Sequence, residues 1–288
     1  MDMTKREDDM TTAEIQTGNR SWWTRNTMSY DFTNAIRLEK FSPLWFDEID
    51  RRFIHDARLF ATDNTPFDRI LPFDFLKDAR VLELGCGMGL HTELMLRAGA
   101  QVTSLDLSPT SVEGTIKRLK LKGLSGNVMT GDAENLPFKA GDFDMVWSWG
   151  VIHHSSRTAR VVREIARVLS PSGSCRIMVY NREGIQAKVG FFKNHIIKGG
   201  FLHRSFEETL YRSTDGFTAR FYVSEQFEDL FRAFFTDVKS EIMGQESDAV
   251  PLPRFIRRFA MPFFSTARLK RAQARRGSFI FLTASKPT

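Results

Sequence analysis

The chain of 288 residues is long enough for one large domain with additions or for two small ones. Hydrophobic residues make up 42% and charged residues 26%, as in ordinary soluble proteins, and because no run of eighteen apolar residues occurs we expect no transmembrane segment. A net charge of +6 would suit a nucleic-acid partner, but the basic excess is concentrated between 254 and 276, so we expect no stable nucleic-acid complex.

The first twenty residues are polar and lack the apolar core of a secretory signal. We therefore expect residues 1–20 to be a disordered tail and the protein to be cytoplasmic. The two cysteines, Cys86 and Cys175, lie in stretches typical of buried thiols in a reducing compartment. Neither has the neighbour spacing of a metal site, and we expect no metal.

An aromatic and helical cap is expected over residues 21–70. Trp22, Trp23 and Tyr30 begin this segment, and two interpretations fit them. They could form a lid that closes over a cofactor or a cationic group, or they could be the apolar staple of an N-terminal helix. Ser42 is then a typical N-cap, followed by proline at the first helical position, which predicts a helix from there.

Over residues 71–288, short apolar runs alternate with amphipathic helical segments, which is typical of right-handed βαβ units and a parallel sheet. The pattern predicts an α/β fold, Rossmann-like and doubly wound. Long excursions at 181–222 and 244–277 interrupt it and indicate inserted lid segments. The expected strands are 80–84, 102–105, 127–130, 144–149, 175–180, 236–243 and 278–286.

The first expected strand ends in a glycine-rich turn with Gly85, Gly87 and Gly89. Such a turn lets a ligand approach the backbone closely at a helix N-terminus. The dinucleotide fingerprint would place its third glycine at position 90, which is leucine here. An acid two residues before the first glycine, Glu83, suits an ammonium group better than a pyrophosphate. The turn therefore favours a cofactor that carries an amino acid over NAD.

Two further acids stand at the ends of the next strands. Asp106 follows the glycines by about twenty residues, where an acid accepts hydrogen bonds from ribose hydroxyls. Asp132 ends the third strand and can accept from an adenine amino group, while the Ala133 backbone pairs with the ring edge. The carboxyl ends of parallel strands line one crevice, so the inferred ligand combines adenine, ribose and a zwitterionic tail.

Four segments between residues 80 and 180 together resemble class I S-adenosylmethionine-dependent methyltransferases of the bacterial small-metabolite type: VLELGCGMG, LDLS, GDAENLPFKAGDFDMVWSWGVIHH and REIARVLSPSG. The resemblance implies S-adenosylmethionine as the cofactor. It also implies a seven-stranded sheet whose last strand is antiparallel, which fits SFIFLTASK near the C-terminus. The residues that it places at the cofactor are Glu83, Gly85, Gly87, Asp106, Leu107, Asp132, Ala133 and Trp149.

Two adjacent histidines, His153 and His154, follow the fourth strand, beside the expected methyl group. A hydroxyl or ammonium acceptor must lose a proton, and histidine is the side chain best suited to take it near neutral pH. The alternative is that one histidine only packs and holds the loop. We expect a small metabolite methylated on oxygen or nitrogen. The alternatives are a thioether amino acid such as methionine, which has no proton to lose, and RNA or a protein.

Arginines and phenylalanines interleave between 254 and 276. This segment could lie on an anionic membrane, bind RNA, or wrap the substrate entrance and a partner subunit. We favour the last interpretation, which makes a homodimer possible.

Overall fold

The computed structural model describes residues 10–31, 35–62, 65–197, 206–211 and 214–288. One sheet runs through the middle of the molecule, in the order β3-β2-β1-β4-β5-β8-β7, and the two-residue strand β6 (Phe221–Tyr222) pairs with β5 off this path. In this order the first five strands, β3, β2, β1, β4 and β5, are parallel to one another. Strand β8 is antiparallel to both of its neighbours, β5 and β7. The predicted doubly wound sheet with an antiparallel last strand is therefore confirmed.

The strands lie close to where the hydrophobic runs placed them. β5 begins at Leu169, six residues before the expected start at 175, and its pairing with β4 shifts in register between Leu169 and Ser174. The other bounds differ from prediction by two residues or fewer. The strands are β1 (Arg80–Leu84), β2 (Gln101–Asp106), β3 (Asn127–Thr130), β4 (Phe143–Trp149), β5 (Leu169–Asn181), β7 (Phe235–Met243) and β8 (Phe279–Pro287).

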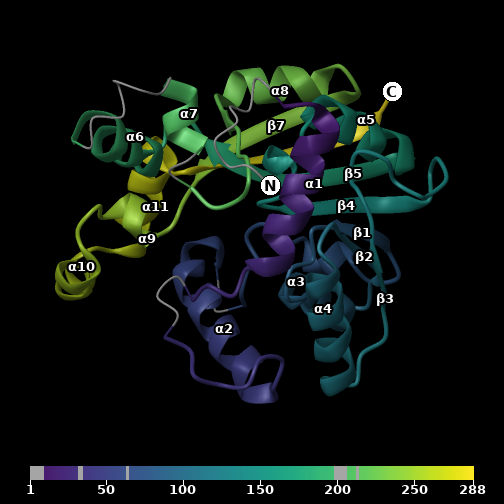
Figure 1. Ribbon diagram of the computed structural model, residues 1–288, viewed down its shortest axis with the longest axis horizontal. Helices are drawn as coiled ribbons and strands as arrows, with labels where there is room; N and C mark the ends of the chain where they lie inside the picture. Colours follow the sequence, from purple (N-terminus) through teal and green to yellow (C-terminus); the bar gives the residue numbers. More distant parts are fainter. Residues whose placement is uncertain (1–9, 32–34, 63–64, 198–205, 212–213) are drawn as a thin grey trace.

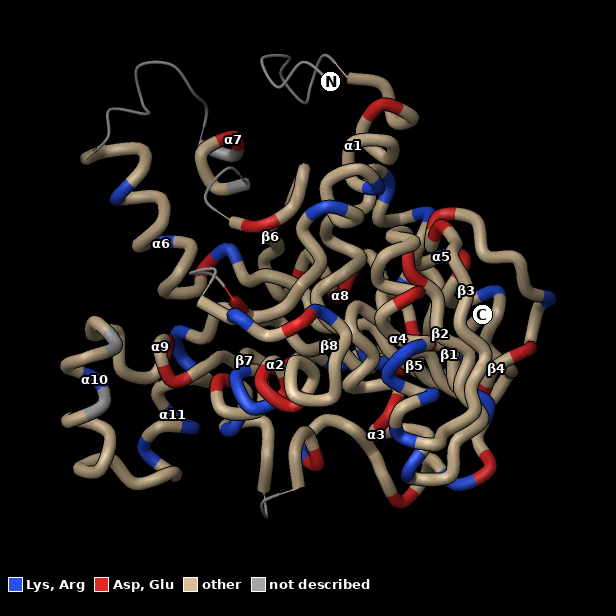
Figure 2. Tube along the Cα trace, turned by 60° about the horizontal axis from the view of Figure 1, so that its bottom comes forward, with Lys and Arg blue, Asp and Glu red and all other residues tan. Residues whose placement is uncertain are grey.

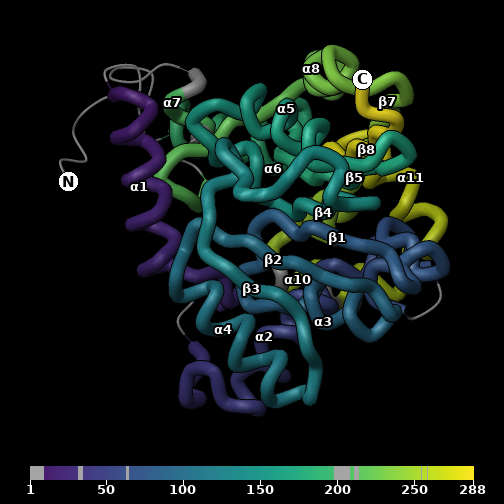
Figure 3. The backbone as a smooth tube through the Cα atoms, turned by 90° about the vertical axis from the view of Figure 1, so that its right-hand side faces the viewer, coloured from purple at the N-terminus to yellow at the C-terminus, as the bar shows by residue number. Residues whose placement is uncertain are grey.

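Helices cover both faces of the sheet in three layers (Figure 3). On one face α5 (Thr158–Val168) and α8 (Ser224–Arg232) bury aliphatic and phenylalanine side chains against the strands. On the other face lie α2 (Pro43–Asp56), α3 (Leu90–Arg97) and α4 (Pro109–Leu121). The proline at the first position of α2 follows the capping side chain of Ser42, as predicted, and the proline of α4 follows that of Ser108.

The N-terminal segment corrects one prediction. Residues 12–20 are helical, because α1 (Thr12–Arg25) begins at a capping box in which Thr11 and Glu14 bond each other's backbone. The expected tail over 1–20 is therefore wrong for the part that the structure describes, and residues 1–9 lie outside it. The helix crosses the front of the sheet in Figure 1, next to the site described below.

The two predicted excursions carry short helices. The first contains α6 (Ile185–Phe191), the π-helical turn η5 (Phe192–Ile197) and α7 (Phe206–Tyr211). The second contains α9 (Glu246–Ala249), α10 (Arg254–Ala260), η7 (Met261–Phe263) and α11 (Thr266–Arg276). Within the described residues, no helix is long and apolar enough to cross a membrane.

Candidate active site

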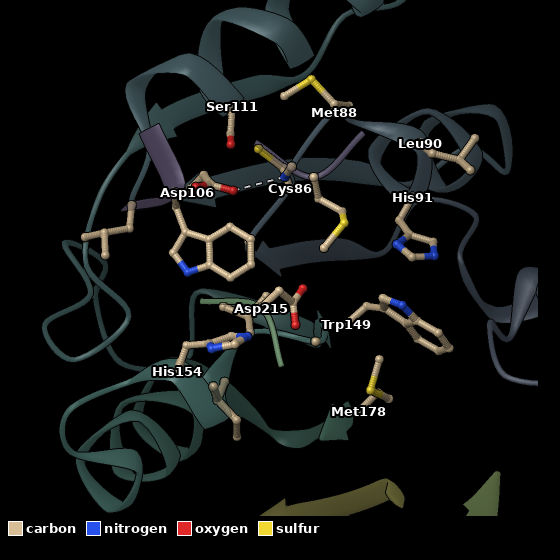
Figure 4. A pocket seen from close by; sticks show the side chains of 18 of the residues that line it. Cys86, Met88, Leu90, His91, Asp106, Ser111, Trp149, His154, Met178 and Asp215 are labelled. Carbon is tan, nitrogen blue, oxygen red and sulfur yellow. Dashed lines mark hydrogen bonds between the residues drawn. The ribbon is translucent and has the colours of Figure 1, made fainter. Parts of the chain in front are cut away.

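A cavity of about 560 Å³ opens at the carboxyl ends of the parallel strands. Its lining brings together the turn after β1, the ends of β2, β4 and β5, and the N-terminal helix (Figure 4). This is the crevice where open α/β sheets bind ligands, and the volume lies in the range of small-molecule sites. Of the predicted site residues, the cavity lining contains Trp23, Tyr30, Gly85, Gly87, Asp106, Leu107, Asp132, Ala133, Trp149 and His154.

The glycine turn combines two requirements for glycine. Gly85 has a φ of +77°, and a Cβ there would lie 2.2 Å from Val151 Cγ2, so both conformation and packing exclude a side chain. Gly87 has a φ of +53°, but a Cβ there would meet nothing within 4 Å. The space in front of Gly87 belongs to the cavity, so the backbone is open to a ligand at this point.

Asp106 connects the second strand to this turn. Its Oδ2 accepts a hydrogen bond from the Gly87 N–H at 3.0 Å, and its Oδ1 accepts one from the Ser108 N–H at 2.8 Å. Burial raises the pKa of Asp106, while these backbone donors act in the opposite direction. Asp106 also lines the cavity, at the strand end where an acid accepts hydrogen bonds from ribose hydroxyls.

Glu83, which was predicted to contact the cofactor, lies outside the cavity. The side chain is 1% exposed and outside the cavity lining, and its carboxylate accepts hydrogen bonds from the hydroxyls of Thr92 and Ser104. Burial raises the pKa of Glu83 to about 7, against the effect of the two hydroxyls. Its observed contacts hold β1, β2 and α3 together below the turn.

The end of β3 is covered by the N-terminal helix. The Nε2 atom of Gln16 donates to both oxygens of Asp132 at 3.0 Å, which is the position expected for an adenine amino group. Three residues later, Asn19 is 2% exposed and donates to the carbonyl oxygen of His154 at 2.6 Å. The covering segment thus begins earlier in the chain than predicted. The capping box at its start was the available signal for a helix.

Aromatic rings form one side of the cavity. Trp149 is surrounded by Phe60, Phe67 and His91, with ring centroids 5.0 to 5.7 Å away. Burial lowers the pKa of His91 to about 3, so this ring is neutral. A neutral aromatic surface suits an adenine ring or an apolar acceptor.

Of the three aromatic residues predicted for the lid, Trp23 and Tyr30 line the cavity and Trp22 lies beside it. Tyr30 stacks on Phe53 with a centroid distance of 4.2 Å, and the Trp23 ring meets the His154 ring edge to face at 5.0 Å. Trp22 packs on Trp23 at 4.6 Å and does not line the cavity. Two of the three predicted lid aromatics therefore face the site.

The two histidines differ in their surroundings. His154 lines the cavity, and its Nδ1 lies 2.6 Å from the carbonyl oxygen of Thr218. Because a carbonyl oxygen only accepts, Nδ1 carries the proton and Nε2 carries the lone pair of the neutral ring. His153 is fully buried outside the cavity, and neither of its ring nitrogens has a hydrogen-bond partner among the described residues. Burial lowers the pKa of both rings, and a neighbouring acid, Asp215, partly opposes this at His154.

The loop before β6 holds His154 and adds residues that sequence analysis missed. Gly216 has a φ of +101°, and a Cβ there would lie 2.6 Å from His154 Nδ1, so only glycine lets the loop pass the ring. Asp215 accepts a hydrogen bond from the hydroxyl of Tyr180 at 2.7 Å, and both residues line the cavity. No local pattern marks Asp215, because it reaches the site only through the fold of the insertion.

Residues 82–177 match the family described as a methyltransferase domain. The chain carries a class I methyltransferase domain. This confirms the sequence-based resemblance and, with it, S-adenosylmethionine as the cofactor of the family. The open space at Gly87 and the carboxylate of Asp106 fit the nucleoside and tail of that molecule.

Curated relatives are similar to the methyltransferase domain over part of their length. A ubiquinone biosynthesis O-methyltransferase of Xanthomonas oryzae is 38% identical over 112 residues, which are 37% of this chain and 45% of the relative. A glycine/sarcosine/dimethylglycine N-methyltransferase of Actinopolyspora halophila is 36% identical over 104 residues, 35% of this chain and 18% of the relative. The chain therefore spans less than half the length of these two relatives.

Solved structures share the fold of the methyltransferase domain at low sequence identity. A phosphoethanolamine N-methyltransferase from Haemonchus contortus, in complex with S-adenosylhomocysteine, has a TM-score of 0.54 and 19% identity, covering 83% of this chain and 58% of that one. The [4+2]-cyclase SpnF has a TM-score of 0.52 and 22% identity, covering 81% and 84%. Because one of these two is described as a cyclase, the fold alone does not determine the reaction.

Proposed function

We propose that this protein transfers a methyl group from S-adenosylmethionine to an oxygen or nitrogen atom of a small molecule, with His154 as the general base. The observation that carries the proposal is the fixed tautomer of His154, whose Nδ1 is committed to the Thr218 carbonyl. S-adenosylmethionine supplies the methyl group on a sulfonium, which makes it an activated electrophile. The remaining task of the chain is to hold an acceptor, exclude water and take the acceptor's proton.

The residues that would hold the cofactor are those at the glycine turn and the strand ends. Asp106 would accept from the ribose hydroxyls, and the open backbone at Gly87 would face the amino-acid tail. Asp132 would accept from the adenine amino group after releasing Gln16. Trp149 would pack against an apolar surface of the bound molecules.

The charges of the lining restrict the acceptor. Five aspartates line the cavity, Asp50, Asp56, Asp106, Asp132 and Asp215, and the one arginine there, Arg118, is paired with the first of them. An anionic acceptor would be repelled by this arrangement, so we infer a neutral or cationic one. A hydroxyl and an amine both satisfy that condition, and the similarity to one O-methyltransferase and one N-methyltransferase supports both.

The decisive experiment is the pH dependence of turnover. Labelled S-adenosylmethionine and a small-molecule extract first identify the methylated product by mass spectrometry. Since burial lowers the pKa of His154, the base is neutral above that pKa, and turnover falls on acidification in a limb below pH 6.5. His154→Asn keeps a donor toward the Thr218 carbonyl, removes the base, lowers turnover by about a hundredfold or more and abolishes the limb.

His153→Asn is the matched control, because His153 lies outside the cavity. It should leave the acid limb and most of the turnover in place. A flat profile with full turnover in His154→Asn would instead indicate an acceptor without a proton to lose, such as a thioether. A chain that binds the cofactor and yields no methylated product would contradict methyl transfer itself.

A further inference from the structure

Exposed apolar side chains concentrate on the two inserted segments. Of the fifteen large hydrophobic residues exposed within the described ranges, four lie in 185–197 and six in 252–264. Phe263 is 82% exposed, Phe255 71% and Ile197 69%. Scattered apolar residues are normal on a protein surface, but a concentration of this kind marks a surface that contacts something else.

The same segments carry positive charge and no negative charge. From residue 249 to the C-terminus there is no Asp or Glu. The segment 249–276 contains eight basic residues: Arg254, Arg257, Arg258, Arg268, Lys270, Arg271, Arg275 and Arg276. Residues 185–197 likewise contain Lys188 and Lys193 and no acid. All 35 acidic residues of the chain lie before residue 249, so the segment 249–276 of the second insertion is electrostatically distinct from the rest of the chain.

Both insertions lie on one side of the molecule. The α6–η5 segment and the α10–α11 segment project from the same end in Figures 1 and 2, away from α4 and α5. Figure 2 shows basic residues along α6 and α11 at that end. We call the exposed surface of 185–197 and 252–276 the basic apolar face.

An outer cavity lies beside this face and next to the active-site cavity. It measures about 1080 Å³ and lies between the end of α2 and the α10–η7 segment, with Phe264 and Met261 in its lining. The outer cavity and the active-site cavity share Asp56 and Gln245. A surface bound at the basic apolar face would therefore lie close to the active-site cavity.

We propose that the basic apolar face binds the surface of an anionic lipid bilayer. Phenylalanines that enter the headgroup region and arginines that pair with lipid phosphates form the two parts of an interfacial membrane contact. A two-fold contact with a second copy would place one positively charged segment against its own equivalent, which is repulsive. The phosphates of RNA would pair with the arginines, but RNA bases stack on aromatic rings and would leave the exposed aliphatic side chains of Ile197 and Ile256 without a matching contact.

The test is sedimentation of the full-length protein with lipid vesicles. The protein should sediment with vesicles of phosphatidylcholine and phosphatidylglycerol, and less with phosphatidylcholine alone or at high salt. Phe255→Ser/Phe263→Ser should weaken the binding at least about tenfold. Arg268→Gln/Arg271→Gln/Arg275→Gln should weaken it about a hundredfold, from ~1 kcal/mol for each basic residue at an anionic surface.

Matched variants on other surfaces control for exposure and charge. Phe75 is 80% exposed before β1, so Phe75→Ser removes an equally exposed ring. Lys120→Gln/Lys139→Gln/Arg163→Gln removes the same charge from exposed positions of the chain outside both insertions. Both controls should bind like the unchanged protein, and S-adenosylhomocysteine binding checks that each variant is folded.

Two results would overturn the proposal. One is equal vesicle binding by the face variants and their controls, or no binding to anionic vesicles at all. The other is a dimer in solution that Phe255→Ser/Phe263→Ser converts to a monomer without any effect of lipid, which would make the face a subunit interface. Neither result depends on methyl transfer, so the proposed function stands or falls separately.

Discussion

The floor and the cover of the active site are built in different ways. The floor consists of the turn after β1 and the end of β2, where a backbone N–H of one segment bonds the carboxylate of the next. The cover consists of α1 and the loop before β6. Hydrogen bonds between residues distant in sequence hold α1 in place: Gln16 donates to Asp132, and Asn19 donates to the carbonyl oxygen of His154. A floor fixed by local geometry is preformed, whereas a cover held by a few long-range bonds can open for exchange of ligands.

The largest expected effect comes from the residue that joins the helices below the site. Arg118 is fully buried and pairs with Asp50 at 2.6 Å and with Glu93 at 3.0 Å. Arg118→Met leaves two partly buried carboxylates without their partner, which should lower the free energy of unfolding by about 3–5 kcal/mol.

Chemical denaturation monitored by circular dichroism measures this loss. The control is Arg80→Gln, which breaks a pair with Asp144 whose two side chains are about half exposed, and we expect its midpoint to stay close to that of the unchanged protein. Equal losses in the two variants would mean that the buried arginine does not hold α2 to the sheet domain.

A smaller effect is expected at the floor. Asp106→Ala removes a charged acceptor for the ribose hydroxyls and for the Gly87 N–H, and should weaken S-adenosylhomocysteine binding by about 1.5–3 kcal/mol. Titration calorimetry gives the affinity. Glu83→Gln is the comparison, since Glu83 lies outside the cavity and we expect a smaller loss there. Unchanged affinity in Asp106→Ala would contradict the assignment of the floor.

The cover should respond more weakly than the floor. Asn19→Ala leaves the buried carbonyl of His154 without its donor and should destabilise the closed position of α1 by about 1 kcal/mol. Protease cleavage after Arg25, at the end of α1, should then be faster. Thr17→Ala is the control, because its hydroxyl donates to the Ala13 carbonyl of the same helix at an exposed position, away from the cleaved bond. Equal cleavage rates would show that Asn19 does not hold the helix.

The smallest expected change is dynamic. Amide exchange over α1 and on to residue 31 should slow when S-adenosylhomocysteine is added, because a cover that admits ligand has to open and then closes on it. The expected cap began at residue 21, and the observed helix α1 extends the covering segment back to Thr12. Identical exchange with and without ligand would identify the segment as a fixed part of the fold.

The sequence alone determined the floor of the site. Strands, capped helices and a glycine turn are local properties, since period, N-cap residues and positive φ are set within a few neighbouring positions. For that reason Gly85, Gly87 and Asp106 could be predicted as cofactor-binding residues, and all three line the cavity. The parallel strands followed from the βαβ pattern, and the antiparallel last strand followed from the resemblance to the family.

Only the tertiary structure decided which polar groups meet above the floor. His153 and His154 are adjacent in sequence, yet one lies outside the cavity and the other lines it, because the loop at Gly216 gives His154 its partner. Gln16 lies more than a hundred residues before its partner Asp132, and Asp215 lies more than sixty residues after His154. No local pattern encodes contacts between segments so far apart in the sequence. A contact between distant segments depends on the packing of the whole chain. The conformational entropy that a segment loses when it is ordered is offset only by the surface that it buries against the other segment.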